Sequence, residues 1–268
     1  MIKELTYREL EKYIPLMEKD RNLNLFFLNN FKLLKYGREY SVYQTGNLLI
    51  MLSKRASMVF FSYGSYDTDE VLAFIKEKKP ISINGPKAAL SPMEDKLKEE
   101  WKVTYSPMMS VTKDSFKKSV KRSDNLSFLL TYEDFLQVAE LYSRDEEFKD
   151  GFETAEKRED WAYEKEEEME YPHAACGYRV KNRLVGAAYL AAATKESAMV
   201  VGVLVDKEWR GGGIGREIAQ EITDIGLNDH LIKRLCLFPS GDIAKHIYAS
   251  LGYLEVGEYA FFRNNSLK

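Results

Sequence analysis

The stretch VLVDKEWRGGGIGRE, Val203–Glu217, holds four glycines within five positions, with Arg210 and Arg216 on either side. It follows an apolar run typical of a strand and precedes a segment in which isoleucines mark one face of a helix. Each glycine costs conformational entropy on folding, so such a cluster needs a local reason. The N-terminus of a helix presents backbone N–H groups without intrahelical partners, and glycines let an anion approach them closely. The stretch therefore predicts a strand–loop–helix unit that binds an anion.

The spacing of these glycines narrows the kind of anion. A phosphate-binding P-loop requires Gly-Lys-Ser or Gly-Lys-Thr, and neither occurs in this sequence. The dinucleotide fingerprint Gly-x-Gly-x-x-Gly also fails, because an arginine or an isoleucine stands where its third glycine would be. What remains is Arg-x-x-Gly-x-Gly, formed by Arg210, Gly213 and Gly215.

This pattern resembles the pyrophosphate-binding motif of the GCN5-related N-acetyltransferase (GNAT) superfamily, which binds acetyl-coenzyme A. A second signature of that family follows in order and spacing, with Ala244, Tyr248 and the segment LGY, Leu251–Tyr253. Two departures stand beside these matches. Asp206 occupies a position where the family often has proline, and Gly241 occupies one where it often has an asparagine that contacts the cofactor.

The resemblance implies a fold, a co-substrate and a set of site residues. The fold is α/β (α+β), a mixed and mostly antiparallel sheet flanked by helices, which we expect in the second half. Tyr248 corresponds to the family's proton donor to the departing thiolate. A phenol suits that task because it is neutral at pH 7. The residues implied to bind acetyl-CoA are Val203, Leu204, Val205, Arg210, Gly211, Gly212, Gly213, Ile214, Gly215 and Arg216.

The chain of 268 residues is long enough for two domains. The polar stretch Lys113–Asp124 is the best candidate for a boundary, which predicts an N-terminal α/β domain over residues 1–120 and a catalytic domain over residues 121–268. The segment NLNLFFLNNFKLLKYG, Asn22–Gly37, is similar to the opening of bacterial two-part GNAT proteins, whose first half is a degenerate relative of the second. Its role could be a scaffold or one wall of the acceptor site.

Composition excludes several classes of protein. The formal net charge of −3 gives no basic field that would favour nucleic acid or an anionic membrane. The charged first residues and the absence of long apolar runs predict a cytoplasmic protein without a membrane span. Cys176 and Cys236 are expected to be buried thiols, and the three histidines show no metal-binding spacing.

The expected activity is direct transfer of an acetyl group from acetyl-CoA to a primary amine of a small molecule or peptide. Two alternatives remain open, an N-acyltransferase that uses a longer acyl-CoA and a non-catalytic acetyl-CoA-binding regulatory protein. The general base is undecided among Asp145, Glu146, Glu147 and Glu196. No metal is expected, and the oligomeric state is left as a monomer or a homodimer.

Overall fold

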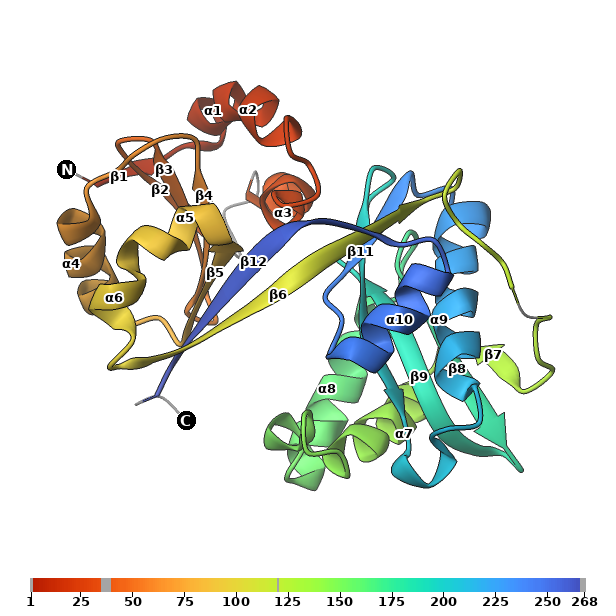
Figure 1. Cartoon of the computed structure of the whole chain (residues 1–268). Coiled ribbons are helices and arrows are strands. Elements are labelled where there is room, and N and C mark those ends of the chain that lie inside the picture. The colour runs from red at the N-terminus through yellow and green to blue at the C-terminus, as the bar shows by residue number, and fades with distance from the viewer. Residues whose placement is uncertain (1, 35–39, 120, 266–268) are drawn as a thin grey trace. The chain divides into compact units, whose positions relative to one another are not determined.

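The computed structural model describes residues 2–34, 40–119 and 121–265 (Figure 1). Its contacts divide the chain into two compact units, which we describe separately. Unit 1 comprises Met1–Met108 and Glu255–Lys268, and unit 2 comprises Met109–Leu254. The boundary of independently folding domains between residues 120 and 121 stays a prediction. The end of the family-like stretch at residues 35–37 and residue 120 of the polar stretch lie outside the described residues.

Unit 1 is built on a mixed sheet in the order β1-β2-β3-β4-β5-β12, followed by the first part of β6. From β1 to β4 the neighbours are antiparallel, β4 and β5 are parallel, and β5 and β12 are antiparallel. Its elements are β1 (Lys3–Leu5), α1 (Tyr7–Leu10), α2 (Ile14–Glu18), α3 (Leu25–Leu34), β2 (Tyr40–Thr45), β3 (Leu48–Ser53), β4 (Ser57–Ser62), α4 (Thr68–Lys78), β5 (Ser82–Pro86), α5 (Lys87–Leu90), α6 (Glu94–Leu97), β6 (Trp101–Thr112) and β12 (Leu254–Asn264).

Unit 2 repeats this arrangement with the order β7-β8-β9-β10-β11, and the last part of β6 follows β11. Here β10 and β11 form the parallel pair. Its elements are β7 (Leu126–Phe128), α7 (Tyr132–Ser143), α8 (Ala155–Glu168), β8 (Ala174–Val180), β9 (Arg183–Ala191), β10 (Ala198–Val205), α9 (Ile214–Asp224), β11 (Arg234–Leu237) and α10 (Asp242–Ser250).

Each unit receives its last strand from the other half of the chain. β12 pairs with β5 in unit 1, with Tyr259 opposite Pro86 and Arg263 opposite Ser82. The end of β6 pairs with β11 in unit 2, with Met109 opposite Leu237. Both units therefore have the same strand–helix order and the same pairing, which fits a first half that is related to the second.

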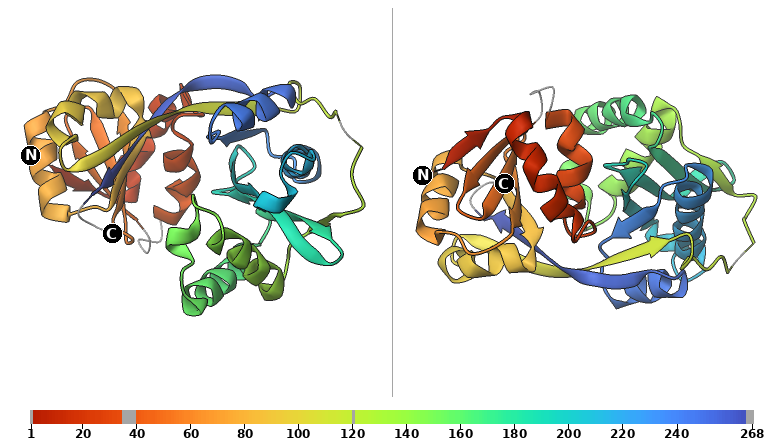
Figure 2. Two further views of the ribbon diagram at one scale, coloured as in Figure 1. Left: turned by 60° about the horizontal axis from the view of Figure 1, so that its bottom comes forward. Right: turned by 90° about the horizontal axis from the view of Figure 1, so that it is seen from above.

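Helices cover both faces of the sheet in unit 2, as Figure 2 shows. On one face α9 and α10 pack on apolar side chains of β8–β11, and Ile218, Ile222 and Leu235 are fully buried there. On the other face α7 and α8 enclose an aromatic cluster that includes Phe135, Tyr142 and Trp161. This second cluster lies directly behind β10, the strand that leads to the glycine loop.

The apolar spacing of Leu5, Leu10, Ile14 and Met17 predicts one helix, and the sequence over residues 92–101 predicts another, but the structure differs from both predictions. The helical spacing of Leu5 to Met17 is interrupted, because Leu5 pairs with Val42 as part of β1. Thr6 then forms a capping box that starts α1 only after this strand. Residues 92–101 contain the end of a 3-10 turn, Ser91–Met93, and the short helix α6, Glu94–Leu97, and Trp101 already begins β6. At the first of these places a capping residue, and not the apolar spacing, determines where the helix begins.

The basic stretch Lys113–Asp124 docks onto α9 within unit 2. Lys118 lies 2.5 Å from Asp224, and the Arg122 Nε donates to Glu221 at 2.7 Å. The backbone N–H of Ser119 donates to the buried Gln220 side chain at 2.7 Å. These contacts explain the polar composition of the stretch.

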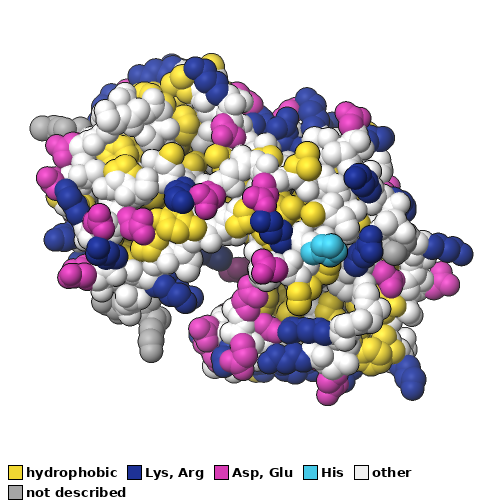
Figure 3. Space-filling view, viewed as in Figure 1, with side chains coloured by type: hydrophobic (Ala, Val, Ile, Leu, Met, Phe, Trp, Pro, Cys, Tyr) yellow, Lys and Arg dark blue, Asp and Glu magenta, His cyan; other side chains and the backbone are white. Residues whose placement is uncertain are grey.

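The visible surface mixes charges of both signs, as Figure 3 shows, in agreement with the small net charge. The acidic residues of α8 form an exposed helix face. In the part of the chain that the structure describes, no helix has both the length and the apolar character needed to cross a bilayer.

Candidate functional site

Strand β10 carries a bulge at Gly202. Its antiparallel register with β9 shifts by one residue between Val201, opposite Tyr189, and Leu204, opposite Ala187. Gly202 has a φ of +62°, and its carbonyl accepts a 2.7 Å hydrogen bond from the buried Tyr142 hydroxyl. A Cβ at this position would lie 2.1 Å from that hydroxyl oxygen, so only glycine fits.

Beyond this region β10 separates from β11. Within the described residues, the two strands pair only through Ala198 with Leu235 and Met199 with Cys236. A cavity of about 160 Å³ opens beside the unpaired part of β10. Its lining combines the β10 segment Met199–Val203 with Glu147 and Phe148 after α7, Phe238 and Ser240 after β11, and Tyr248 of α10.

The glycine loop begins α9 without any side chain at its cap. Gly211 and Gly213 adopt left-handed φ angles of +86° and +88°, and Gly213 is the N-cap of the helix. A Cβ added at Gly211 or Gly213 would meet nothing within 4 Å. The Gly213 carbonyl accepts from the N–H groups of Arg216 and Glu217, so these first-turn donors are used. The earlier N–H groups, including that of Gly215, have no partner among the described residues.

Arg210 is held by two hydrogen bonds. Its Nε donates to the Val205 carbonyl at 2.8 Å, and its Nη2 donates to Asp145 Oδ2 at 2.7 Å. Burial opposes ionisation of Asp145, but the backbone N–H of Glu147 and the guanidinium of Arg210 outweigh it and lower the pKa of the carboxyl. The ion pair therefore ties the loop to the end of α7.

Tyr248 lines the cavity from α10. Its side chain is almost fully buried and packs edge-to-face on Tyr253, with ring centroids 5.4 Å apart. Burial raises the pKa of the Tyr248 phenol well above its usual value. The hydroxyl therefore stays protonated through the physiological range and can donate a proton.

The structure separates the four carboxylates considered as a general base. Asp145 is paired with Arg210, Glu146 with Lys149, and Glu196 with Lys233. Glu147 lines the cavity, and no described cation forms an ion pair with it.

The remaining predicted residues divide between the cavity and the core. Val203 lines the cavity, whereas the Leu204 side chain packs in the aromatic cluster behind β10. The Val205 side chain lies against the glycine loop, near Gly215. Ile214 is buried, and Arg216 is half-buried with its Nε unpaired among the described residues.

The sequence analysis did not identify Gly202 and Phe238 as residues of the site, nor the aromatic cluster behind β10. An isolated glycine inside an apolar strand is a recognised sign of a bulge, so Gly202 offered a signal. The position that the family often fills with asparagine is Gly241, the N-cap of α10, which also has no side-chain cap. The backbone at that helix end is open in the same way as at Gly213.

The cysteines and histidines have structural surroundings. Cys176 and Cys236 are free and buried, and burial raises the pKa of the Cys176 thiol. His173 accepts from the Ala193 N–H at 3.3 Å, and His230 Nδ1 lies 3.1 Å from the Pro172 carbonyl. No cluster of three or more His, Cys, Asp or Glu side chains in residues 2–34, 40–119 and 121–265 could hold a metal ion.

The open helix end, the bulged strand and the cavity fit a CoA-type ligand. A pyrophosphate requires several backbone donors that no side chain covers, and the cradle at Gly211–Gly215 provides them. A pantetheine arm requires a slot with unpaired backbone along a strand, and β10 provides one beside the cavity. Two arginines add positive charge to the loop.

Comparison with known proteins agrees with this site. The model of the Acetyltransferase (GNAT) family matches residues 135–253, which include β10, the glycine loop and Tyr248. No curated protein matches the sequence. Residues 135–253 are thus similar in sequence to the GNAT acetyltransferase family.

Solved structures extend the likeness of fold to nearly the whole chain. A GCN5-related N-acetyltransferase from Kribbella flavida has a TM-score of 0.65 at 15% identity, with 89% of this chain and 95% of that chain covered. One from Sphaerobacter thermophilus has a TM-score of 0.63 at 12% identity, with 98% and 95% covered. A tandem GNAT protein from the clavulanic acid biosynthesis pathway has a TM-score of 0.58 at 11% identity, with 98% and 97% covered. The chain has the GNAT fold in a two-part α/β arrangement.

Proposed function

We propose that the protein is an N-acetyltransferase that transfers an acetyl group from acetyl-CoA to a primary amine. The observation that carries the proposal is the uncapped N-terminus of α9 next to a bulged strand and a cavity lined by Tyr248. The backbone donors of Gly211–Gly215, with Arg210 and Arg216, would hold the pyrophosphate. The unpaired backbone edge of β10 near Val203 would hold the pantetheine arm.

The residues of the cavity supply the acid and the base of the reaction. When bound, acetyl-CoA supplies an activated thioester carbonyl. Glu147 removes one proton from the acceptor ammonium, directly or through one water, so that the nitrogen lone pair attacks the acyl carbon. The C–S bond breaks, Tyr248 gives its proton to the departing sulfur, and the second proton lost by the attacking nitrogen returns through water to the Tyr248 phenolate. Backbone N–H groups of β10 that have no partner on the β11 side stabilise the negative charge on the acyl oxygen.

The acceptor would be a cation before reaction. Glu147 stands exposed at the cavity, where a carboxylate attracts an ammonium group and can then accept its proton. Its neighbour Phe148 stacks on Tyr142, with centroids 4.6 Å apart, and this contact fixes the loop that carries Glu147. A small-molecule or peptide amine meets these requirements.

Ligand titration tests the donor. CoA and acetyl-CoA should raise the melting temperature in a concentration-dependent manner, because they bind the folded state. Parallel titrations with longer acyl-CoAs address the alternative donor, since tighter binding and faster turnover of a longer chain would replace acetyl-CoA in the proposal. The absence of stabilisation by every CoA species would refute it.

A thiol-release assay with a library of primary amines tests the transfer. Glu147→Gln should lower turnover with the preferred amine by about 10²-fold and leave acetyl-CoA binding intact, because only the base is lost. Glu146→Gln is the matched control and should leave turnover within a few-fold of wild type. If acetyl-CoA binds but no amine in the library releases CoA, the regulatory alternative gains support over the enzyme.

A further inference from the structure

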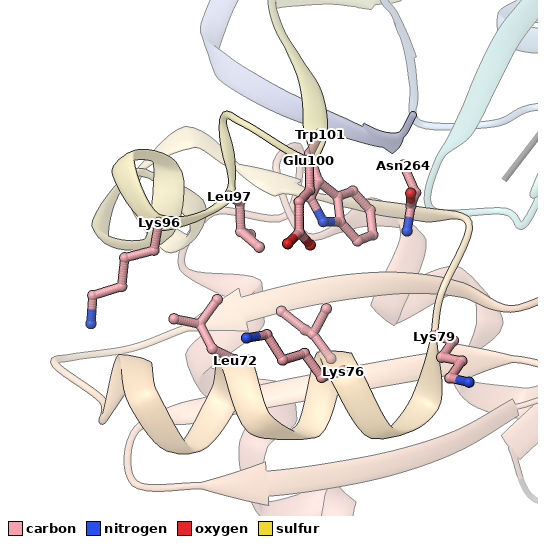
Figure 4. A pocket seen from close by; sticks show the side chains of 9 residues that line it. Leu72, Lys76, Lys79, Lys96, Leu97, Glu100, Trp101 and Asn264 are labelled. Carbon is pink, nitrogen blue, oxygen red and sulfur yellow. The ribbon is translucent and has the colours of Figure 1, made fainter. Parts of the chain in front are cut away.

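Unit 1 contains a second cavity of about 460 Å³, larger than the one beside β10 (Figure 4). It lies between α4 and the segment that joins α6 to β6. Its volume falls in the range of about 300–1000 Å³ that is typical of small-molecule pockets. It shares no residue with the glycine loop or the cavity lined by Tyr248.

The floor of this cavity is apolar. Ile75, Leu97 and Trp101 are almost fully buried and still form part of its wall, together with the half-buried Leu72. An apolar side chain of a ligand would cover these surfaces and gain about 25 cal/mol for each Å² that it removes from water. The floor therefore favours an aliphatic or aromatic group.

The rim carries charges of both signs that do not pair with one another. Lys76 and Lys79 come from the last turn and the C-cap of α4, and Glu100 directly precedes Trp101. None of the three forms an ion pair with any described residue, whereas Lys96 at the same cavity is paired with Asp69. Figure 4 shows the Lys76 ammonium and the Glu100 carboxylate directed into the same hollow, with Lys96 and Lys79 at its two ends.

The backbone fixes these rim groups in place. Lys79 has a left-handed φ of +48°, and its N–H caps α4 by donating to the Ile75 carbonyl. The Glu100 carbonyl accepts from the Asn265 N–H at 3.0 Å. The dipole of α4 accounts for cations at its C-terminus, but it does not account for the opposing carboxylate or for the apolar floor.

We propose that this cavity binds a free apolar α-amino acid. Its carboxylate would contact Lys76, its ammonium would contact Glu100, and its side chain would lie on Leu72, Leu97 and Trp101. An amino-acid zwitterion carries its ammonium and its carboxylate on the same α-carbon. This arrangement matches the Lys76 ammonium and the Glu100 carboxylate, which face the same hollow without forming an ion pair (Figure 4). The site gives unit 1 a ligand-binding function that does not depend on acetyl transfer.

Fluorescence of Trp101 tests the proposal on the full chain. The sequence holds three tryptophans, so Trp161→Phe combined with Trp209→Phe leaves Trp101 as the only one. L-Leucine should then change the emission in a saturable manner. L-Leucinamide, which lacks the carboxylate, and N-acetyl-L-leucine, which lacks the ammonium, should each bind about fivefold more weakly, as expected for loss of one partly exposed charge contact. Calorimetric titration of the unmodified protein provides the same comparison without tryptophan changes.

Single variants assign each charge. Glu100→Gln should bind L-leucine and N-acetyl-L-leucine equally, and Lys76→Met should bind L-leucine and L-leucinamide equally. Glu99→Gln alters an exposed neighbour that does not line the cavity and should behave as wild type. The proposal is overturned if neither method detects saturable binding of L-leucine, or if the three ligands bind the wild-type protein with equal affinity.

Discussion

The chain contains two strand–loop–helix segments at corresponding places in its two units. In unit 1, β4 leads through residues 63–67 into α4, and the Asp67 side chain accepts hydrogen bonds from the N–H groups of Asp69 and Glu70. In unit 2, β10 leads through residues 206–213 into α9, whose N-cap is Gly213 without a side chain. The first helix end already has a carboxylate in the position where an anion would bind, and the second leaves that position open.

The strands that precede the two loops also differ, because one is regular and the other is bulged. β4 pairs with β3 in an uninterrupted register from Met58 to Ser62, whereas β10 is bulged at Gly202. The two units thus share a fold but differ in whether the helix end after the loop is capped by a side chain. We expect the cap and the regular strand of unit 1 to disfavour an anionic ligand at that helix end.

The largest effect is expected from giving unit 2 the cap of unit 1. Gly213→Asp should weaken acetyl-CoA binding by about 10³-fold, because a carboxylate at the helix end repels a phosphate by roughly 4 kcal/mol at close range. Aspartate tolerates a positive φ better than most residues, so the fold should persist. Isothermal titration measures the affinity, and Gly151→Asp, which adds the same charge at an exposed glycine outside the loop and the cavity, should stay near wild type. Binding of Gly213→Asp within tenfold of wild type would show that the pyrophosphate lies elsewhere.

The second-largest effect is expected from removing the proposed proton donor on α10, the helix that follows the parallel strands β10 and β11. α10 carries Tyr248, while α5 and α6, the corresponding helices of unit 1, contain no tyrosine. Tyr248→Phe should lower kcat about 10²-fold and leave the affinity for acetyl-CoA unchanged, because only the proton donor is lost. Tyr253→Phe removes a hydroxyl bonded to Thr223 outside the cavity and should spare kcat. Unchanged turnover in Tyr248→Phe would refute the acid role.

A smaller effect should follow from adding a side chain at Gly202, the bulge that distinguishes β10 from the regular strand β4. Gly202→Ala places a Cβ against the Tyr142 hydroxyl and should destabilise the protein by about 1–3 kcal/mol. Chemical denaturation measures the free energy of unfolding. In Gly151→Ala the added methyl meets no atom within 4 Å, so its stability should change little. An equally stable Gly202→Ala would mean that the bulge is not held by this contact.

The smallest effect is expected from removing the cap in unit 1. Asp67→Ala should cost about 1 kcal/mol of stability, as for other N-caps, and should leave acetyl-CoA affinity unchanged. Asp67→Asn keeps a capping oxygen and should retain most of the stability. If Asp67→Ala created a second CoA-binding site, the regular β4 strand would not contribute to closing unit 1.

The sequence predicted those parts of the fold where local signals and burial agree. The sequence of Tyr132–Ser143 predicts a helix and forms α7, because Thr131 makes a capping box ahead of an apolar face. The alternating and apolar runs over residues 174–205 are typical of strands, and they form β8, β9 and β10. The family resemblance also predicted the loop and Tyr248, whose roles remain proposals.

Long-range pairing could not be predicted from the same signals. Nothing local in residues 254–264 indicates that they pair with Ser82–Pro86, because strand propensity does not specify a partner. Which of the four candidate carboxylates form ion pairs could not be predicted either, because their partners are set by the fold. Asp145, Glu146 and Glu147 are adjacent in sequence, and only the positions of Arg210 and Lys149 distinguish them.

The exchange of final strands has a consequence for biosynthesis. A chain leaving the ribosome usually folds its N-terminal part first. Here β5 pairs with β12, so the sheet of unit 1 stays incomplete until residues 255–264 have been synthesised. The edge of β5 is exposed during that interval, and closing so long a loop slows folding. We expect the two units to finish folding together, after translation has passed both, and the nascent chain to depend on chaperones that shield an open strand edge.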